Sequence, residues 1–210
     1  MAKSKNGFFG QLSGRIGNVV VSSWKGIPYI RSKPVGNTSN TRAQQNQRGK
    51  FKLVIDFLNS IKPVINAGFK WNTDRMTEMN SATSYIMKRA VRGEHPDLRI
   101  HYPLVLVARG DLPEPQQTAV TRENETELRF SWRCDTNSGR GRGKDHVLAL
   151  AYCPETERGV WLADGSVLRK EQQFKLTLPQ EWNSRAVETY LAFAAPDGSD
   201  ASNSVHLGRL

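Results

Sequence analysis

Seven short apolar or alternating runs, separated by turn residues, follow one another in the second half of the chain. They lie at 117–121, 127–133, 146–153, 159–162, 173–178, 186–194 and 204–208. Alternation is clearest at Leu128, Phe130 and Trp132, which would share one face because side chains two apart on a strand point the same way. Short strands with such regular turns predict an antiparallel sandwich.

The segment before these runs carries a helical pattern. Thr41 and Gln44 have the spacing of a capping box, which predicts a helix start. One apolar stripe at helical spacing follows it, and its members are Phe51, Val54, Ile55, Leu58 and Ile61. Pro63 interrupts this helix, and Gly68 ends a short continuation.

Two further elements are predicted between the first helix and the sandwich. Residues 77–91 carry a second helical stripe, with Gly93 as its stop. After Pro96, residues 100–107 predict a strand that joins the two halves of the chain.

The first forty residues combine glycines with large apolar groups and contain no acidic residue. The run 19–21 and the run 28–31 predict two strands joined at Lys25-Gly26, with the second strand at an edge because Pro28 has no N–H to donate. We expect an arm that becomes ordered against a partner or against the rest of the chain, since disordered tails are poor in large apolar groups.

Together these patterns predict an α+β protein with three regions. A basic, glycine-rich arm and β-hairpin spans 1–34, a helical region spans 35–98, and an antiparallel sandwich spans 99–210.

The positive charge lies in the first half of the chain. Residues 1–100 contain seventeen Lys and Arg against five Asp and Glu, a net +12, whereas residues 101–210 carry thirteen against fifteen, a net −2. A field of one sign on one part of a protein favours a polyanion such as nucleic acid, or an acidic protein surface.

We find no sequence signal for secretion or for a membrane span. No run approaches the ~18 apolar residues of a membrane span, and no apolar core of a signal peptide follows Lys3 and Lys5. We expect a cytoplasmic or virion protein that is not secreted by a standard signal peptide and has no membrane partner.

Several residues of the sandwich carry a resemblance to a known fold. Trp132, Tyr152, Tyr190 and the segment 176–179 (LTLP) resemble the fibronectin type III or immunoglobulin-like pattern over about 112–210. The resemblance implies the fold and says little about function, because such sandwiches serve many roles. It also implies that Cys134 and Cys153 lie at opposite ends of the sandwich, as free thiols.

Four segments carry a second resemblance, which extends over the whole chain. They are GQLSGRIGN at 10–18, WKG at 24–26, IRSKP at 30–34 and SNS at 202–204. In these segments the chain is similar to a family of basic proteins encoded by Bacteroidota, whose activity is not established. Thr41, Gln44, Arg48 and Phe51 also fit T-x-x-Q-x-x-x-R-x-x-F, a segment similar to one in phage structural proteins.

The search for catalytic chemistry finds no motif. The histidines 95, 101, 146 and 206 are scattered without Cys or His at metal-ligand spacing, and no G-x-S-x-G elbow occurs. We therefore expect no catalytic residues, no metal, no cofactor and no small-molecule substrate, and we predict that the protein is not an enzyme.

The loop 138–144 (SGRGRGK) does not fit the phosphate-binding G-x-x-x-x-G-K-[ST] frame, because Ser138 and Asp145 occupy positions where that frame needs Gly and Ser or Thr. Its arginines either follow a phosphate backbone or keep a flexible loop soluble. Both interpretations remain open.

Two functions from different classes fit these observations. The first is a non-enzymatic structural protein that docks through its basic arm on the protein subunits of a large assembly, such as a phage or phage-like particle. The second is a nucleic-acid or ribonucleoprotein binder of low sequence specificity, in which aromatic side chains stack on bases beside cations. A surface adhesin-like module is a third reading, opposed by the missing signal peptide.

The candidate residues for contact with a partner or with nucleic acid are shared by these hypotheses. Trp24 and Tyr29 are equally suited to the core of the hairpin, and we favour that role over stacking on bases. The full set is Phe8, Phe9, Arg15, Trp24, Lys25, Tyr29, Arg31, Lys33, Arg42, Arg48, Lys50, Arg140 and Arg142.

Overall fold

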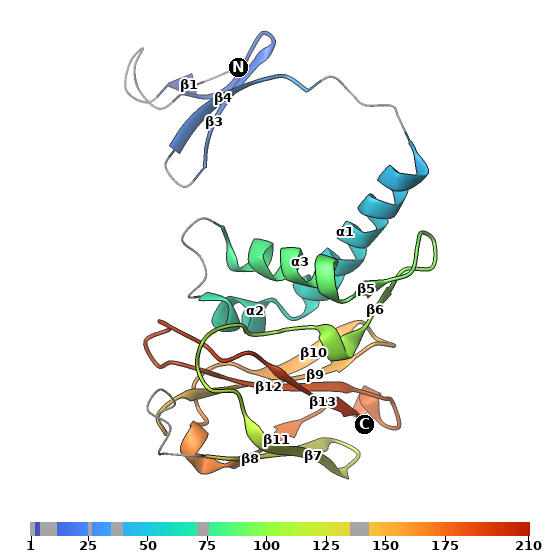
Figure 1. Ribbon diagram of the computed structural model, residues 1–210, viewed down its shortest axis with the longest axis vertical. Helices are drawn as coiled ribbons and strands as arrows, with labels where there is room; N and C mark the ends of the chain where they lie inside the picture. The colour runs from blue at the N-terminus through green and yellow to red at the C-terminus, as the bar shows by residue number, and fades with distance from the viewer. Residues whose placement is uncertain (1–2, 5–11, 25–26, 35–39, 71–75, 135–142) are drawn as a thin grey trace. The chain divides into compact units, whose positions relative to one another are not determined.

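The computed structural model describes residues 3–4, 12–24, 27–34, 40–70, 76–134 and 143–210 (Figure 1). The chain forms two compact units, Met1–Asn40 and Thr41–Leu210. The predicted α+β class is confirmed, because strands in the first unit are followed by helices and then by antiparallel sheets in the second. The predicted helical region, from residue 41 onward, and the predicted sandwich both lie in the second unit, where they share a core.

The first unit is an antiparallel sheet with the strand order β1-β2-β3-β4. Its strands are β1 (Lys3–Ser4), β2 (Leu12–Ile16), β3 (Val19–Trp24) and β4 (Ile27–Ser32). The predicted hairpin is confirmed by the ladder between β3 and β4, which places Trp24 opposite Ile27 and Val21 opposite Ile30. Pro28 lies in β4, the edge strand, as its missing N–H requires.

The second unit begins with α1 (Arg42–Ser60), α2 (Lys62–Gly68) and α3 (Glu78–Arg89). The predicted capping box is present: the backbone N–H of Gln44 donates to Thr41 Oγ1, and the backbone N–H of Thr41 donates to Gln44 Oε1, each at 3.3 Å. Pro63 lies in the first turn of α2, where its missing N–H breaks no helical hydrogen bond.

Burial along α1 follows the predicted stripe only in part. Val54, Leu58 and Ile61 are fully buried, but Phe51 is 52% exposed. Phe57, outside the predicted stripe, is buried instead. The cluster of buried residues that includes α1 begins at Val54, with the partly buried Leu53 packed against it, so the first half of the helix packs less against the rest of the unit.

The strands predicted from the alternation pattern are confirmed within one or two residues at most ends. The sandwich strands are β7 (Gln116–Asn124), β8 (Glu127–Arg133), β9 (His146–Cys153), β10 (Arg158–Leu162), β11 (Gln173–Thr177), β12 (Glu188–Ala194) and β13 (Val205–Arg209). Short 3-10 turns lie at η3 (Arg169–Glu171) and η4 (Gln180–Trp182).

These strands form two antiparallel sheets, with orders β10-β9-β12-β13 and β11-β8-β7. The first, second and fifth strands of the sandwich thus share one sheet, and the remaining four share the other. This arrangement confirms the predicted fibronectin type III or Ig-like sandwich.

The four-stranded sheet is covered on both faces, with helices on one side and the three-stranded sheet on the other (Figure 1). From β9, Leu150 and Tyr152 pack in the cluster of the helices, whereas Ala149 and Ala151 pack in the cluster between the sheets. All seven residues of β12 are buried. Such a central layer needs continuous apolar strands, because successive side chains alternate between two dry faces.

The strand predicted over 100–107 is wrong. Only β6 (Arg99–Ile100) is a strand, paired with β5 (Val91–Arg92), and it is followed by the 3-10 turn η2 (Tyr102–Leu104). Pro103 explains the difference, since proline lacks the N–H that a ladder needs and suits the first turn of a helix.

Close backbone packing joins the helices to the chain that follows η2. A Cβ at Gly68 would lie 2.5 Å from the backbone oxygen of Val107, so only glycine fits there. The N–H of Arg109 donates to the Gly68 carbonyl at 3.0 Å. The end of α2 therefore fixes the path of the segment that enters the sandwich.

Candidate functional site: the N-terminal sheet

The register of the N-terminal sheet sorts its side chains onto two faces. Residues directly opposite each other share a face, and faces alternate along each strand. Val19 lies opposite Ile16 and Ser32, and Val21 lies opposite Gly14 and Ile30. One face therefore gathers Ile16, Val19, Val21, Pro28 and Ile30, and we call it the aliphatic face.

The aliphatic face is poorly covered. Val21 is 7% exposed, but Ile16, Val19 and Ile30 are 54%, 39% and 71% exposed. Among the described residues of this unit, Val21 is the one apolar side chain that is buried. Sequence reasoning did not select Ile16, Val19 or Ile30, because the register that brings them together could not be known beforehand.

The opposite face gathers cations and aromatic rings. Val20 pairs with Arg15 on one side and Arg31 on the other, Ser22 pairs with Tyr29, and Trp24 pairs with Ile27. We call Arg15, Trp24, Tyr29 and Arg31 the aromatic–basic face. Trp24 and Tyr29 are 47% and 41% exposed, so their rings are accessible and do not form a closed hairpin core.

Lys33 continues this arrangement beyond β4, where its N–H donates to the Asn18 carbonyl at 2.7 Å. The structure thus brings Arg15, Trp24, Tyr29, Arg31 and Lys33 together on one small sheet. Phe8, Phe9, Lys25, Arg140 and Arg142 lie outside the described residues.

The other candidate cations belong to the second unit. Arg42 pairs with Glu94 at 2.8 Å on the surface. Arg48 is exposed and Lys50 is half-buried on α1. Arg48 and Phe51 are three residues apart, which makes them neighbours on the exposed side of this helix.

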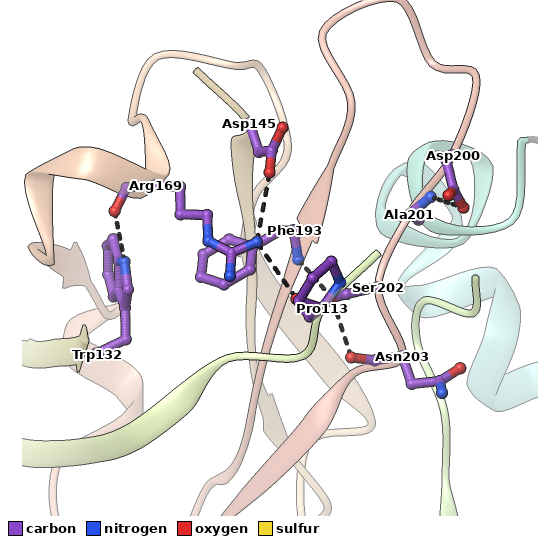
Figure 2. A network of polar contacts seen from close by, with 9 residues as sticks. All are labelled: Pro113, Trp132, Asp145, Arg169, Phe193, Asp200, Ala201, Ser202 and Asn203. Atoms are coloured by element: carbon purple, nitrogen blue, oxygen red, sulfur yellow. Dashed lines mark hydrogen bonds and ion pairs between the residues drawn. The ribbon is translucent and has the colours of Figure 1, made fainter. Parts of the chain in front are cut away.

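Sequence reasoning missed the buried ion pair between Arg169 and Asp145, which join at 3.4 Å (Figure 2). The same guanidinium donates to the Pro113 carbonyl at 3.3 Å and lies 4.3 Å from the centre of the Phe193 ring. The Arg169 carbonyl accepts a hydrogen bond from Trp132 Nε1 at 2.7 Å.

This cluster joins two loops to the sandwich, since Asp145 precedes β9 and Pro113 precedes β7. Both charged side chains are almost fully buried, at 3% and 4% exposure. Because a substrate could not reach them, the cluster has a structural role.

The SNS segment at 202–204 also has a structural role. Ser202 Oγ accepts from the Phe193 N–H and donates to the Asn203 carbonyl, at 2.9 and 3.0 Å (Figure 2). Ser204 Oγ accepts from the Val107 N–H at 2.9 Å. The segment thus ties the last strand to β12 and to the chain that enters the sandwich.

A hollow of about 330 Å³ lies beside α1, where Phe57, Tyr102 and Tyr152 form part of its lining. Burial, the largest cause, raises the pKa of Tyr102 to about 12 and raises that of Tyr152 as well. Both hydroxyls therefore stay protonated at neutral pH and act as hydrogen-bonding groups, not as bases.

Within the described ranges, no group of three or more His, Cys, Asp or Glu side chains is arranged to hold a metal ion. Over the same residues, no helix has the length and apolar character that a membrane span requires. Cys134 and Cys153 are free thiols, as predicted.

Solved fibronectin type III domains are similar to part of the chain. The FN5 domain of Drosophila Lar aligns with 46% of this chain and 90% of its own length, at 16% identity and a TM-score of 0.33. The fn3 domain of human contactin 1 aligns with 46% of this chain and 76% of its own, at 10% identity and a TM-score of 0.32.

No curated protein sequence matches the chain. A family of unknown function, DUF6266, matches residues 10–208, which include most of the N-terminal sheet and all of the sandwich except the last residue of β13. The chain therefore belongs to the DUF6266 family.

Proposed function

We propose that this protein is a non-enzymatic assembly protein that docks on protein subunits of a large complex through its N-terminal sheet. The observation that carries the proposal is the aliphatic face. Ile16, Val19 and Ile30 leave 39–71% of their surface in water, on a sheet whose described residues bury a single apolar side chain, Val21. Covering such a face removes apolar surface from water, which stabilises a complex.

The second unit supplies a body that does not need the sheet for its core. The members of its three core clusters all lie between Leu53 and Leu207. An assembly protein of this design keeps a folded body and presents a separate docking element. The similarity of Thr41, Gln44, Arg48 and Phe51 to a segment of phage structural proteins favours a phage or phage-like particle as the assembly.

The test is sedimentation of the tagged protein through a gradient, from cells that make its native complex. The full chain is expected to sediment with large particles, and the fragment 41–210 to remain at the top while keeping its fold. Retained sedimentation of the fragment would contradict docking through the sheet.

Matched point variants locate the docking face. The double variant Ile16→Gln/Val19→Gln changes two directly opposed side chains of the aliphatic face and is expected to abolish particle association. Ile27→Gln changes an apolar side chain on the other face that is 67% exposed, and it is expected to leave association intact. If the two variants had equal effects on particle association, the aliphatic face would not be the docking surface.

A second candidate function is binding of single-stranded nucleic acid, which the aromatic–basic face favours. Aromatic rings on a basic sheet offer stacking surfaces beside phosphate-binding cations. The first forty residues contain six Lys and Arg and no Asp or Glu, so nothing on this unit repels a polyanion. Low specificity is expected, because stacking and phosphate contacts do not read base edges.

Fluorescence anisotropy with a labelled single-stranded oligonucleotide tests this candidate, using the full chain and the fragment 41–210. A fragment 1–100 is unsuitable, because it would separate the helices from Leu150, Tyr152 and Tyr190 of their own core. Binding by the full chain alone, weakening steeply with salt as counterions are released, is the expected result. Absence of binding at low salt would eliminate the candidate.

A further inference from the structure

We infer that the edge strand β4 pairs with β4 of a second copy of this chain, which joins two N-terminal sheets into one. The inference deepens the proposed assembly function and rests on it, because it names one partner of the docking sheet. Among the described strands, β4 has a neighbour on one side only, β3, and all six of its residues are exposed.

The backbone groups that face this free edge follow from one hydrogen bond. The Lys33 N–H donates to the Asn18 carbonyl, so the pair Asn18–Lys33 is a hydrogen-bonded pair of the antiparallel ladder. Hydrogen-bonded and non-hydrogen-bonded pairs alternate. Pro28, Ile30 and Ser32 therefore turn their backbone groups away from β3, toward the edge.

Antiparallel pairing of two β4 strands about Ile30 satisfies these groups except the Ser32 carbonyl, which faces Pro28 of the second copy. Ile30 of one copy lies opposite Ile30 of the other, and the two exchange both N–H···O=C bonds. Each Ser32 N–H then meets the Pro28 carbonyl of the other copy. The proline, which lacks an N–H, is used only as an acceptor in this register.

The side chains also fit this register. On the aliphatic face, Ile30 meets Ile30 of the second copy. On the other face, Arg31 lies opposite Tyr29 of the second copy, a cation–aromatic pair, and no two cations are directly opposed.

The neighbouring registers are worse. Moving the strands by two residues one way places Arg31 opposite Arg31 of the second copy, and directly opposed like charges destabilise a sheet. Moving them the other way places each Ile30 opposite Pro28 of the second copy, which removes one hydrogen bond from each such pair. The sequence of β4 thus selects the register centred on Ile30.

The charge of the unit gives this contact a distinctive salt dependence. Six Lys and Arg without an acidic residue make two copies of the unit repel each other. Salt screens that repulsion, so self-pairing is expected to strengthen as salt rises. Bridging by nucleic acid would weaken with salt instead.

Sedimentation velocity of the nuclease-treated full chain provides the first test. A monomer–dimer equilibrium is expected, at least about threefold tighter near 0.5 M than near 0.05 M NaCl. Ile30→Pro removes the central N–H at a position of the same type as native Pro28 and is expected to weaken the dimer at least tenfold, since two hydrogen bonds are lost. Ile30→Val keeps the N–H and is expected to change the dimer less than about twofold.

Cross-linking tests the register. In a Cys134→Ser background, Ile30→Cys is expected to form a disulfide-linked dimer on mild oxidation, because opposed Cα atoms of such a pair lie about 5.5 Å apart. Ser32→Cys is the matched control, since two copies of position 32 would lie about 13 Å apart. Equal cross-linking at both positions would overturn the register.

A full chain that stays monomeric at about 200 μM, or a dimer that Ile30→Pro leaves unchanged, would overturn the inference. If the chain is monomeric but still needs residues 1–40 to join particles, only the self-pairing is wrong. If it pairs through β4 but never joins particles, only the proposed assembly function is wrong.

Discussion

The strands β3 and β9 are both rich in apolar residues, but they lie in different environments. β3 reads VVVSSW and β9 reads HVLALAYC, and both contain a run of apolar residues. In β9, Val147 to Cys153 are at most 3% exposed. In β3, Val21 is buried while Val19 is 39% and Trp24 47% exposed.

The difference comes from the layers around each strand. β9 has helices on one side and a second sheet on the other, so both of its faces are dry. β3 is one of two inner strands of a small sheet, and the described residues of its unit leave most of the aliphatic face uncovered. An apolar run therefore indicates a surface that is stabilised when it is covered, and for the first unit we propose that a partner covers it.

The largest loss of stability expected in the second unit follows the substitution Arg169→Met. It removes the guanidinium that pairs with the Asp145 carboxylate, which is only 4% exposed, and should cost about 3–5 kcal/mol of unfolding free energy. Urea denaturation measures this loss. Asp145→Asn added to Arg169→Met should recover much of it, and a double variant as unstable as the single one would contradict the explanation.

A cavity in the central strand should cost somewhat less. Leu150→Ala in β9 removes a fully buried side chain beneath the helices, for an expected loss of about 2–5 kcal/mol. The matched variant Ile30→Ala in β4, where the side chain is 71% exposed, should change the same unfolding transition by less than about 0.5 kcal/mol. Similar losses of unfolding free energy in the two variants would contradict the difference in burial between β9 and β4.

A smaller, pH-dependent effect is expected from the tyrosines beneath the helices. Burial raises the pKa of Tyr102 from 10.0 to about 12 and also raises the pKa of Tyr152 and Tyr190. Between pH 10 and 12 the unfolded chain binds fewer protons than the folded one, so stability must fall as the pH rises.

Urea denaturation at several values between pH 9 and 12 checks this sign. Tyr190→Phe removes one of the raised groups and should flatten the decline. A stability that rises with pH over this interval would contradict the assignment.

The smallest effect on the second unit should follow removal of the first. Deleting residues 1–40 should shift the thermal midpoint of 41–210 by less than about 2 °C, because the core clusters lie between Leu53 and Leu207. Differential scanning calorimetry measures the shift. A much larger loss would show that the second unit depends on the sheet for its stability.

The sequence by itself determined the local elements. The Thr41 cap, the break at Pro63 and the seven sandwich strands were predictable, because each depends on residues close together in the chain. The presence of cations and aromatic residues in the strands of the N-terminal sheet was also predictable, because these residue types are adjacent in the sequence. The exposure of Trp24 and Tyr29 was not predictable, because both residues also suit the core of a hairpin.

Only the tertiary structure decided which side chains are buried and which ones pair. Arg169 and Asp145 are twenty-four residues apart, and their pairing depends on two loops meeting across the sandwich. Phe51 is exposed while Phe57 is buried, because contact with other elements chose between two aromatic positions on one helix. The aliphatic face depends on register, which sorts Ile16, Val19 and Ile30 together although alternation alone permits other pairings. Local patterns fix which residues form strands, and packing alone decides whether their apolar sides face a core or a partner.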